Sequence, residues 1–191
     1  MGASLFIFLH VFCVGRPIST GYILGGLSVR SFITIIVFLF SSVVAYAGTM
    51  EVRPSDPIAE FNIPGDWKTS RIDRGIQAIS KDGEVYFWIE SYKPDELSQI
   101  IAEHNAYWKE QGVTITSSDE QKHQENGKEV MFTTEHATWK GATTVLYYIE
   151  FQLGLASQSN IVFTYWASPD GDKTFQKEVG DVLGSLVVTE K

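Results

Sequence analysis

The chain has 191 residues, with 23 Asp and Glu against 15 Lys and Arg, which gives a formal net charge of −8. This acidic balance argues against binding to nucleic acid or to an anionic membrane surface, because both need a positive partner. All of the acidic residues lie beyond residue 47, and they are scattered rather than clustered. That distribution is typical of a surface that keeps a protein in solution.

Residues 29–47 have the pattern of a secretory signal peptide. Arg30 supplies the positive end, residues 32–44 form an apolar core, and Ala45 and Ala47 are the small residues that precede a cleavage site. We predict cleavage after Ala47 and a single domain over residues 48–191. The protein is then expected to be exported, to a periplasm or to the extracellular space.

Three alternatives for the leader stay open. A membrane-spanning helix needs about 20 apolar residues, so this run is short for one, but an uncleaved signal would still anchor the protein to a membrane. Residues 1–28 suit a signal poorly, and a start at Val29 would make them an N-terminal extension that is not translated. A start at Met50 would give a cytosolic protein and leave the signal without a role.

Cys13 is the only cysteine, and it lies within residues 1–28. The residues before it, His10-Val11-Phe12, do not suit a lipoprotein signal, which has small residues at that place. The predicted mature chain therefore has no disulfide and no thiolate metal site. A bacterial periplasm permits disulfides without requiring them, so this composition is compatible with export.

Short strands and tight turns are predicted for the first part of the mature domain. Pro and Gly mark turns, and alternating apolar residues mark strands. The expected elements are an extended lead-in over 51–59, a Pro64-Gly65 turn followed by Trp67 as a core anchor, a strand over 76–80, an Asp82-Gly83 turn, and a central strand over 85–92 with large apolar groups on both faces.

A helix of about four turns is predicted over residues 97–111. Pro94, Asp95 and Glu96 are expected to open it, because Pro suits a first turn and acids complement the positive end of the helix dipole. Gly112 is the expected C-terminal stop. The residues at helical spacing that form its buried face are Leu97, Ile100, Ile101, His104 and Trp108.

An antiparallel meander and a second helix are predicted for the rest of the chain. Asn126-Gly127 is the strongest hairpin signal, because both turn positions need a positive φ. Strands are expected over 113–125, 129–139, 143–153 and 161–167, with a Lys140-Gly141 turn and a loop over 154–160. A turn at Pro169-Asp170-Gly171 and a cap at Asp172 or Thr174 are expected before a final helix, which buries Phe175, Val179, Val182, Leu183 and Leu186.

This order of elements predicts an α+β fold, an antiparallel β-sheet meander packed by two amphipathic helices. The helices are separated by runs of strands, and tight hairpins join the strands. The sequence leaves open whether the helices cover one face of the sheet or both.

The predicted domain resembles the PsbP-like superfamily, also called Mog- or DcrB-type. The resemblance covers nearly the whole of residues 48–191 and depends on Phe61-x-Ile63-Pro64-x-x-Trp67, on the meander through Asn126-Gly127 and on the order of the two helices. It implies an antiparallel sheet sandwiched by helices. Members include a photosystem subunit of the thylakoid lumen, a nuclear regulator of a small GTPase and bacterial envelope proteins. Most are not enzymes and their partners differ, so the resemblance implies a fold and not a task.

The three histidines of the mature chain each have a structural interpretation. His104 lies on the apolar face of the first helix and is expected to be a satisfied core residue, while the adjacent Glu103 points to another face. His123 is expected at a solvated strand end, where it shares a face with Glu125 but lacks an evident third metal ligand. His136 is expected in a polar row on one sheet face, with Thr134 and Thr138.

No recognised catalytic, metal or cofactor motif is present in the sequence. The searched patterns are the paired-histidine zinc motif, the nucleophile elbow, the phosphate-binding loop and the dinucleotide fingerprint. Asp170-Gly171-Asp172 resembles the start of a calcium loop but lacks the later ligands. A set of aromatic residues is expected mostly in core packing, with a ligand groove on one sheet face as the alternative: Tyr86, Trp88, Tyr92, Tyr147, Tyr148, Tyr165 and Trp166.

We therefore expect an exported, non-catalytic envelope protein that binds a protein partner or a small ligand and needs no cofactor. One alternative is an enzyme whose carboxylates meet in space, with Asp66, Asp73, Glu90 and Glu150 as candidates. Glu90 and Glu150 each interrupt an apolar strand. The other alternative is an accessory factor anchored to the membrane through an uncleaved signal.

Overall fold

The computed structural model describes residues 46–53, 57–125 and 128–189. Within these residues, ten strands form two antiparallel sheets. The smaller sheet has the order β1-β2-β10, and the larger has the order β3-β4-β5-β9-β8-β7-β6. The strands are β1 (Tyr46–Val52), β2 (Ala59–Pro64), β3 (Lys68–Ile72), β4 (Gly75–Ile79), β5 (Val85–Tyr92), β6 (Val113–Glu125), β7 (Lys128–Trp139), β8 (Ala142–Phe151), β9 (Asn160–Ala167) and β10 (Val187–Val188).

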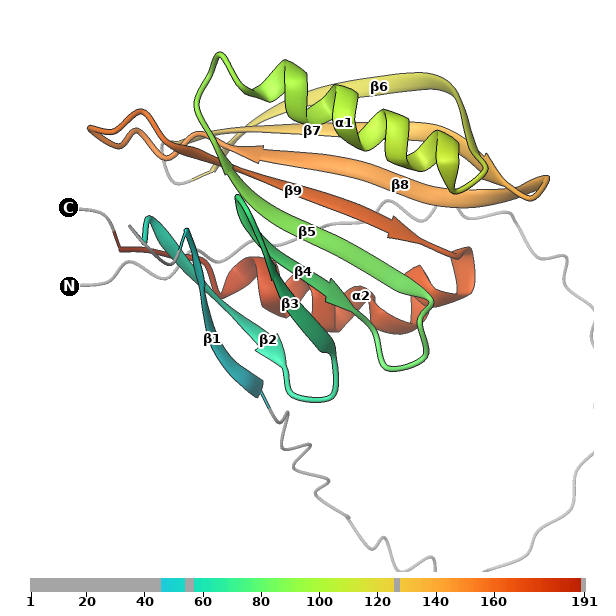
Figure 1. Cartoon of the computed structure of the whole chain (residues 1–191), viewed down its shortest axis with the longest axis horizontal. Coiled ribbons are helices and arrows are strands. Elements are labelled where there is room, and N and C mark those ends of the chain that lie inside the picture. The colour runs from blue at the N-terminus through green and yellow to red at the C-terminus, as the bar shows by residue number, and fades with distance from the viewer. Residues whose placement is uncertain (1–45, 54–56, 126–127, 190–191) are drawn as a thin grey trace, which may run out of the picture. The chain divides into compact units, whose positions relative to one another are not determined.

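The two helices lie on opposite faces of the larger sheet (Figure 1). These helices are α1 (Leu97–Glu110) and α2 (Pro169–Gly184). The α+β fold predicted from the sequence is confirmed. The alternative that the sequence left open is also decided, because each helix covers its own face.

The alternating side chains of β5 supply both faces of the sheet. Val85, Phe87 and Ile89 are fully buried in the core beneath α2. Tyr86 and Trp88 point the other way and pack near α1. A strand with large apolar groups on both faces must be covered twice, so β5 is a central strand, as predicted.

The core beneath α2 is almost entirely apolar. Phe175, Val179 and Val182 bring the buried stripe of α2 onto the sheet. Trp67 packs edge-on against Phe175 with ring centroids 5.6 Å apart, and its Nε1 donates a hydrogen bond to Glu178. The predicted anchor is therefore in place, and its one polar atom is satisfied.

The start of α2 differs from the prediction. Pro169 is not in a turn before the helix but is its first residue, and Ser168 is the N-cap in place of Asp172 or Thr174. The Ser168 hydroxyl accepts a hydrogen bond from the Gly171 N–H at 2.9 Å. Ser is a strong N-cap and Pro is favoured at the first helical position, so these two residues outweighed the Pro-Asp-Gly turn signal.

The start of α1 also differs, by a few residues. Pro94 and Asp95 lie in a turn, and the helix begins at Leu97 with Glu96 as its N-cap. The Glu96 carboxylate accepts a hydrogen bond from the Lys93 N–H at 2.8 Å, which closes the turn.

Two parts of the fold were not predicted. Strand β3 has an exposed, polar sequence without apolar alternation, so it gives no strand signal. The smaller sheet joins segments from the two ends of the domain, where Val187 pairs with Glu60 and Val188 with Ala59. A two-residue strand such as β10 has no sequence period, so only the folded chain shows it.

Several predictions lie outside the described residues. These are the extension over 1–28, nearly all of the signal over 29–47, and the Asn126-Gly127 turn itself. The pairing of Glu125 with Lys128 on either side of that turn agrees with the predicted hairpin. Within the described residues, no helix is both long and apolar enough to cross a membrane.

Candidate functional site: a polar groove beside helix α1

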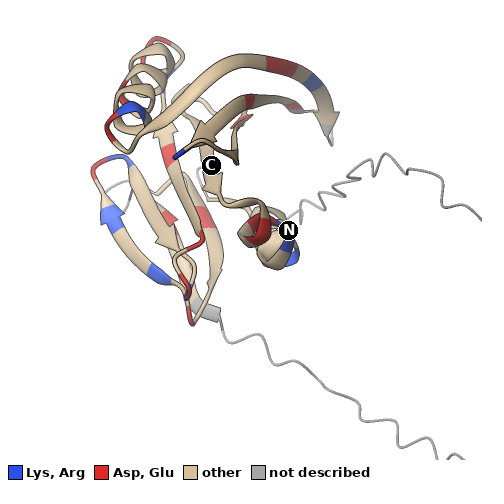
Figure 2. Cartoon of the chain, turned by 90° about the vertical axis from the view of Figure 1, so that its right-hand side faces the viewer, with Lys and Arg blue, Asp and Glu red and all other residues tan. Residues whose placement is uncertain are grey.

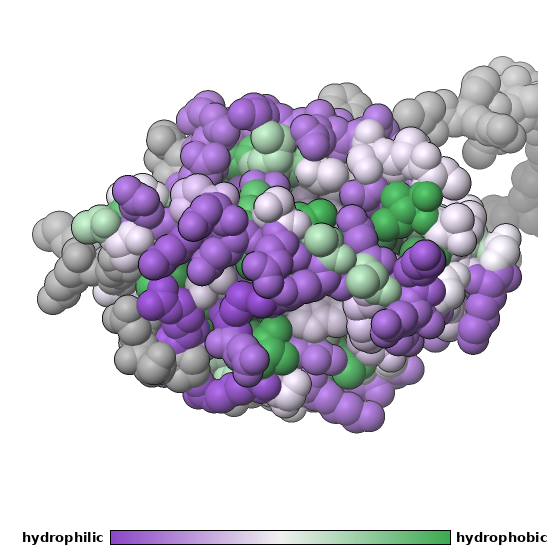
Figure 3. Space-filling model, turned by 45° about the horizontal axis from the view of Figure 1, so that its top comes forward, coloured by the Kyte–Doolittle hydropathy of each residue, from purple (hydrophilic) through white to green (hydrophobic). Residues whose placement is uncertain are grey.

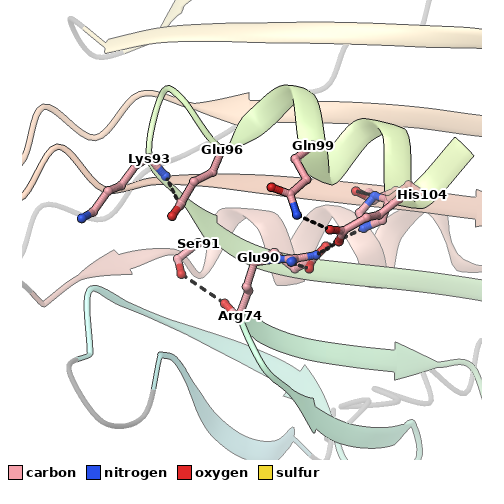
Figure 4. A network of polar contacts seen from close by, with 9 residues as sticks. Arg74, Glu90, Ser91, Lys93, Glu96, Gln99 and His104 are labelled. Atoms are coloured by element: carbon pink, nitrogen blue, oxygen red, sulfur yellow. Dashed lines mark hydrogen bonds and ion pairs between the residues drawn. The ribbon is translucent and has the colours of Figure 1, made fainter.

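A groove of about 590 Å³ lies between α1 and the turn that joins β3 to β4. The turn supplies Asp73 and Arg74, and α1 supplies Glu103, His104 and Tyr107. The remaining lining residues come from strands and are Arg71, Ile72, Gln77, Trp88 and Glu90. The groove therefore gathers ionisable groups from segments that are far apart in the sequence (Figure 4).

Glu90 lies at the floor of this groove on β5. Its side chain is only 3 % exposed. One carboxylate oxygen, Oε1, accepts a hydrogen bond from Nε of Arg74 at 3.1 Å. A buried carboxylate is costly unless it is paired, so Arg74 is the main reason that Glu90 is tolerated on a buried strand.

His104 meets the same carboxylate from α1. Its Nε2 lies 2.7 Å from Oε2 of Glu90, and its Nδ1 lies 3.2 Å from the Thr164 hydroxyl. The Nε2 contact is not aligned as a hydrogen bond, and Oε2 has no hydrogen-bond partner among the described residues. His104 is nonetheless buried and contacted on both ring nitrogens, as expected for a core histidine.

Arg74 links this buried pair to the surface. Its terminal nitrogen donates to Oε2 of Glu103 at 2.6 Å, and Gln99 donates to the other oxygen of Glu103 at 2.9 Å. The hydrogen bond from Arg74, then that from Gln99, holds the pKa of Glu103 below its ordinary value. Glu103 and His104 point in different directions from α1, as predicted. Arg74 connects them indirectly, because it donates hydrogen bonds both to Glu103 and to Glu90, which His104 contacts.

Sequence reasoning missed Arg74 and Thr164. Arg74 follows a polar strand and precedes a glycine, so it looked like any surface turn residue. Thr164 interrupts the apolar run of β9 in the way that Glu90 interrupts β5, and this shared interruption was the available signal. In the structure both interruptions lie under His104.

The hydroxyl group in contact with His104 is not exposed. The Thr164 hydroxyl is within reach of His104, but Thr164 is fully buried. The described residues contain no group of three or more His, Cys, Asp or Glu side chains that could hold a metal ion. The network fixes α1 to the sheet and leaves a polar groove at its rim.

The four carboxylates named as an alternative catalytic set do not all come together, because only Asp73 and Glu90 line the same groove. Glu90 and Glu150 both flank Val162, one on each side, so they share a sheet face but are separated by β9. Two strand spacings place their Cα atoms about 10 Å apart. Asp66 lies elsewhere in an exposed pair with Lys81 at 3.0 Å, and Asp73 alone joins Glu90 in the groove.

Glu150 has its own environment. Burial raises its pKa above the ordinary value, and the nearby charge of Glu120 adds to this, while a hydrogen bond with Tyr92 opposes it. Burial and Glu150 in turn raise the pKa of Tyr92. Glu150 is therefore a half-buried carboxylate that interacts with Tyr92 and not with Glu90.

The other two histidines lie away from the groove. His123 is exposed on β6, as predicted, and the side chain of Glu125 lies outside the described set. The Nε2 of His136 lies 2.6 Å from Oδ2 of Asp119, and both side chains are more than half exposed. His136 and Thr134 lie on one strand face, in agreement with the expected polar row.

The aromatic residues do not share one face, which corrects the groove alternative. Tyr147 and Tyr165 stack 4.4 Å apart on the α2 side of the sheet. Tyr148 lies on the other side, where its hydroxyl accepts a hydrogen bond from Nε1 of Trp108, and burial raises its pKa to about 12. The remaining members on the α1 side are Tyr86, Trp88, Tyr92 and Trp166.

Comparison with solved structures shows that this fold is similar to that of a PsbP protein. The solution structure of cyanobacterial PsbP from Synechocystis sp. PCC 6803 matches with a TM-score of 0.53 and 8% identity, over 78% of this chain and 96% of that one. The Saccharomyces cerevisiae Ran-binding protein Mog1p matches with a TM-score of 0.46 and 10% identity, over 75% of this chain and 96% of that one.

A third match is a Pseudomonas aeruginosa protein of unknown function, PA94, described as a putative regulator, with a TM-score of 0.37 and 10% identity over 69% of this chain and 92% of that one. No family model and no curated protein matches the sequence. The predicted PsbP-like fold is therefore confirmed by structure, and identities this low show the fold alone.

Proposed function

We propose that this chain is an exported, non-catalytic binding module whose groove beside α1 receives a segment of a partner protein. The observation that supports this most directly is the division of labour in the groove. Arg74 and His104 both contact the buried Glu90 carboxylate, whereas Arg71 and Asp73 on the rim are exposed. The paired, buried groups form a rigid floor of the groove, and the exposed groups on the rim are available to bind a partner.

A protein segment fits the chemistry of the rim. Arg71 makes no ion pair or hydrogen bond with another described side chain, and Tyr107 is half-exposed beside it in the groove. Arg and Tyr are enriched among the residues that carry most binding energy in protein interfaces. The guanidinium of Arg71 can pair bidentately with a carboxylate of the partner.

The predicted leader supports an envelope location for this interaction. The signal pattern over 29–47 is the reason for proposing export, and the acidic chain is compatible with an aqueous compartment. The mass of the protein recovered from cells tests this part. A mature chain that begins at Gly48 supports export with cleavage, and a chain that retains residues 32–47 supports the membrane-anchored alternative.

Crosslinking in intact cells, followed by purification and mass spectrometry, tests the groove. The double variant Arg71→Glu with Tyr107→Ala alters the rim without touching Glu90 or His104. Lys173→Glu on α2 is the matched control, because Lys173 is exposed on the opposite side of the sheet. We expect one dominant partner with the unaltered protein and with the control, and at least a tenfold loss with the double variant, roughly 1.4 kcal/mol.

Three outcomes contradict the proposal. Equal recovery of the partner with the groove variant and the control places the interface elsewhere. Absence of any partner, together with turnover of a substrate that the groove variant abolishes, supports the carboxylate enzyme instead. Retention of a small molecule by the unaltered protein alone assigns the groove to a ligand of low molecular mass.

A further inference from the structure

The larger sheet has two edges of different character. One edge is β3, which has five residues, and the other is β6, which has thirteen. Strand β6 pairs only with β7, so the backbone N–H and C=O groups on its outer side are unpaired within the sheet. A long edge of this kind is a template for pairing with another strand.

The middle of β6 is open to solvent. Every residue from Thr116 to Gln124 is exposed, and Figure 1 shows the strand at the margin of the sheet. The surface around α1 and the top of the sheet is mostly hydrophilic, with only scattered apolar patches (Figure 3). Backbone hydrogen bonds and charge, not a large apolar patch, are therefore what this edge offers to a partner.

The charges on β6 are arranged symmetrically about Gln121. Two acids, Asp119 and Glu120, precede it, and two cationic or titratable residues, Lys122 and His123, follow it. Figure 2 shows acidic and basic bands next to each other on this strand. If β6 of a second copy pairs antiparallel with this strand about Gln121, the acids of one strand lie opposite Lys122 and His123 of the other.

The register of that pairing is specific. With a two-fold axis at Gln121, Glu120 lies directly opposite Lys122 of the second copy, and Asp119 lies opposite His123 of the second copy. Each pair occurs twice, since the axis relates the two copies. Residues that lie directly opposite each other on antiparallel strands point to the same face of the sheet, so the two side chains of each pair can meet.

Within one chain, Lys122 and Asp119 each already contact a residue of opposite or titratable charge on β7. Lys122 pairs with Glu129 on β7 at 3.1 Å, and Asp119 contacts His136 at 2.6 Å. Docking the second copy extends each contact into a row of alternating charge across three strands. Networks of this kind hold charges better than isolated surface pairs do.

The β3 edge provides the contrast. Its charged residues are Lys68 and Arg71, both exposed and both positive. Any antiparallel pairing of two β3 strands therefore brings like charges together, which is unfavourable. The charges therefore favour antiparallel pairing of two copies at β6 and disfavour it at β3.

We propose that two copies of this chain dimerise through antiparallel pairing of their β6 strands about Gln121, which joins the two larger sheets into one. This inference is independent of the groove beside α1 and goes beyond the proposed binding of a partner protein. The interface is isologous, so it closes at two copies.

Charge reversal tests the pairing in a way that folding defects do not imitate. Glu120→Lys places lysines opposite each other in a homodimer, and Lys122→Glu does the same with glutamates. For each purified variant, we expect the dissociation constant of the dimer, measured by analytical ultracentrifugation, to rise about tenfold. A mixture of the two variants restores both attractive pairs and is expected to dimerise like the unaltered protein.

Disulfide crosslinking tests the register. Paired residues of antiparallel strands have Cα atoms about 4.5–5.5 Å apart, within the range of a disulfide. In a Cys13→Ser background, Gln121→Cys is expected to form a crosslinked dimer on oxidation. Gln124→Cys is the matched control, because its two copies lie about 20 Å apart in this register.

Several results overturn the proposal. They are an unaltered protein that stays monomeric throughout the micromolar range, charge-reversal variants that dimerise normally, a mixture that does not recover, and equal crosslinking of the two cysteine variants. A mass that keeps growing with concentration also overturns it, because a contact between β3 and β6 would be open-ended.

Discussion

The two faces of the larger sheet differ in the polarity of the side chains that they bury. The face under α2 packs aliphatic and aromatic side chains against one another, with Phe87, Phe163 and Phe175 at its centre. The face under α1 is also aromatic, but it encloses a carboxylate, a histidine and a hydroxyl within the same layer. The α2 face stabilises the fold through apolar packing. The α1 face buries polar groups in part of its area, and these groups line a groove.

The largest expected effect is on the α2 face. Phe163 is fully buried, with its ring centroid 5.1 Å from that of Phe87. Phe163→Ala removes this packing and leaves a cavity, so we expect a loss of about 3–5 kcal/mol in the free energy of unfolding, measured by urea denaturation.

Phe132→Ala is the control, because Phe132 lies at the margin of the same core and is only partly buried. It is expected to cost distinctly less than Phe163→Ala. Equal losses for the two variants would show that the α2 face is not the dense half of the molecule.

An intermediate effect is expected on the α1 face. Glu90→Ala leaves Arg74 and His104 without their common partner in a buried place, and we expect a loss of about 1–3 kcal/mol. The lower part of the range for buried pairs applies because the Arg74 side chain is 35% exposed. The measurement is urea denaturation at low and high salt, and the loss should persist at high salt because burial limits screening.

The exposed pair of Lys122 and Glu129 supplies the comparison for that result. Glu129→Ala removes a surface ion pair, which typically contributes about 0–1 kcal/mol and weakens with salt. A Glu90→Ala loss as small and as sensitive to salt as that of Glu129→Ala would remove the distinction between the polar floor of the groove and ordinary surface charge.

The smallest expected effect is at Glu150, and it has a sign that depends on pH. Its pKa in the folded chain is raised above the ordinary value of 4.5, so the folded state holds this proton more firmly than the unfolded state does. Stability from this group is present below the ordinary pKa and is lost as pH rises through the raised pKa.

Glu150→Gln removes that loss. The variant is expected to gain at most about 0.5 kcal/mol over the unaltered protein at about pH 7 and nothing at about pH 4, since the group is about half exposed. Paired urea denaturations at the two pH values measure the difference. A gain at the lower pH only would reverse the assigned sign.

The sequence predicted the parts of this fold that have a local cause. The hairpin at Lys140 and Gly141 was predicted from its composition, and both residues do adopt positive φ angles of 51° and 81°. The span of β6 matches its prediction, and α1 ends one residue before the predicted C-terminus. Turn chemistry and helical period act over a few residues, so a single sequence carries them.

The missed parts depend on partners that are distant in the sequence. β10 is defined only by its pairing with β2, and the groove is defined by a turn meeting a helix about thirty residues later, as Arg74 meets Glu103 with a sequence separation of 29. The sequence marked Glu90 and His104 as unusual residues on a strand and a helix. It did not show that one lies directly over the other.

The pairing of β10 with β2 has a consequence for synthesis. The Thr189 N–H donates to the Ile58 carbonyl at 3.0 Å, so the last described residue is hydrogen-bonded to one of the first segments of the domain. The smaller sheet therefore cannot close until residues 187–189 have left the ribosome. Until then, β2 lacks one of its two neighbouring strands.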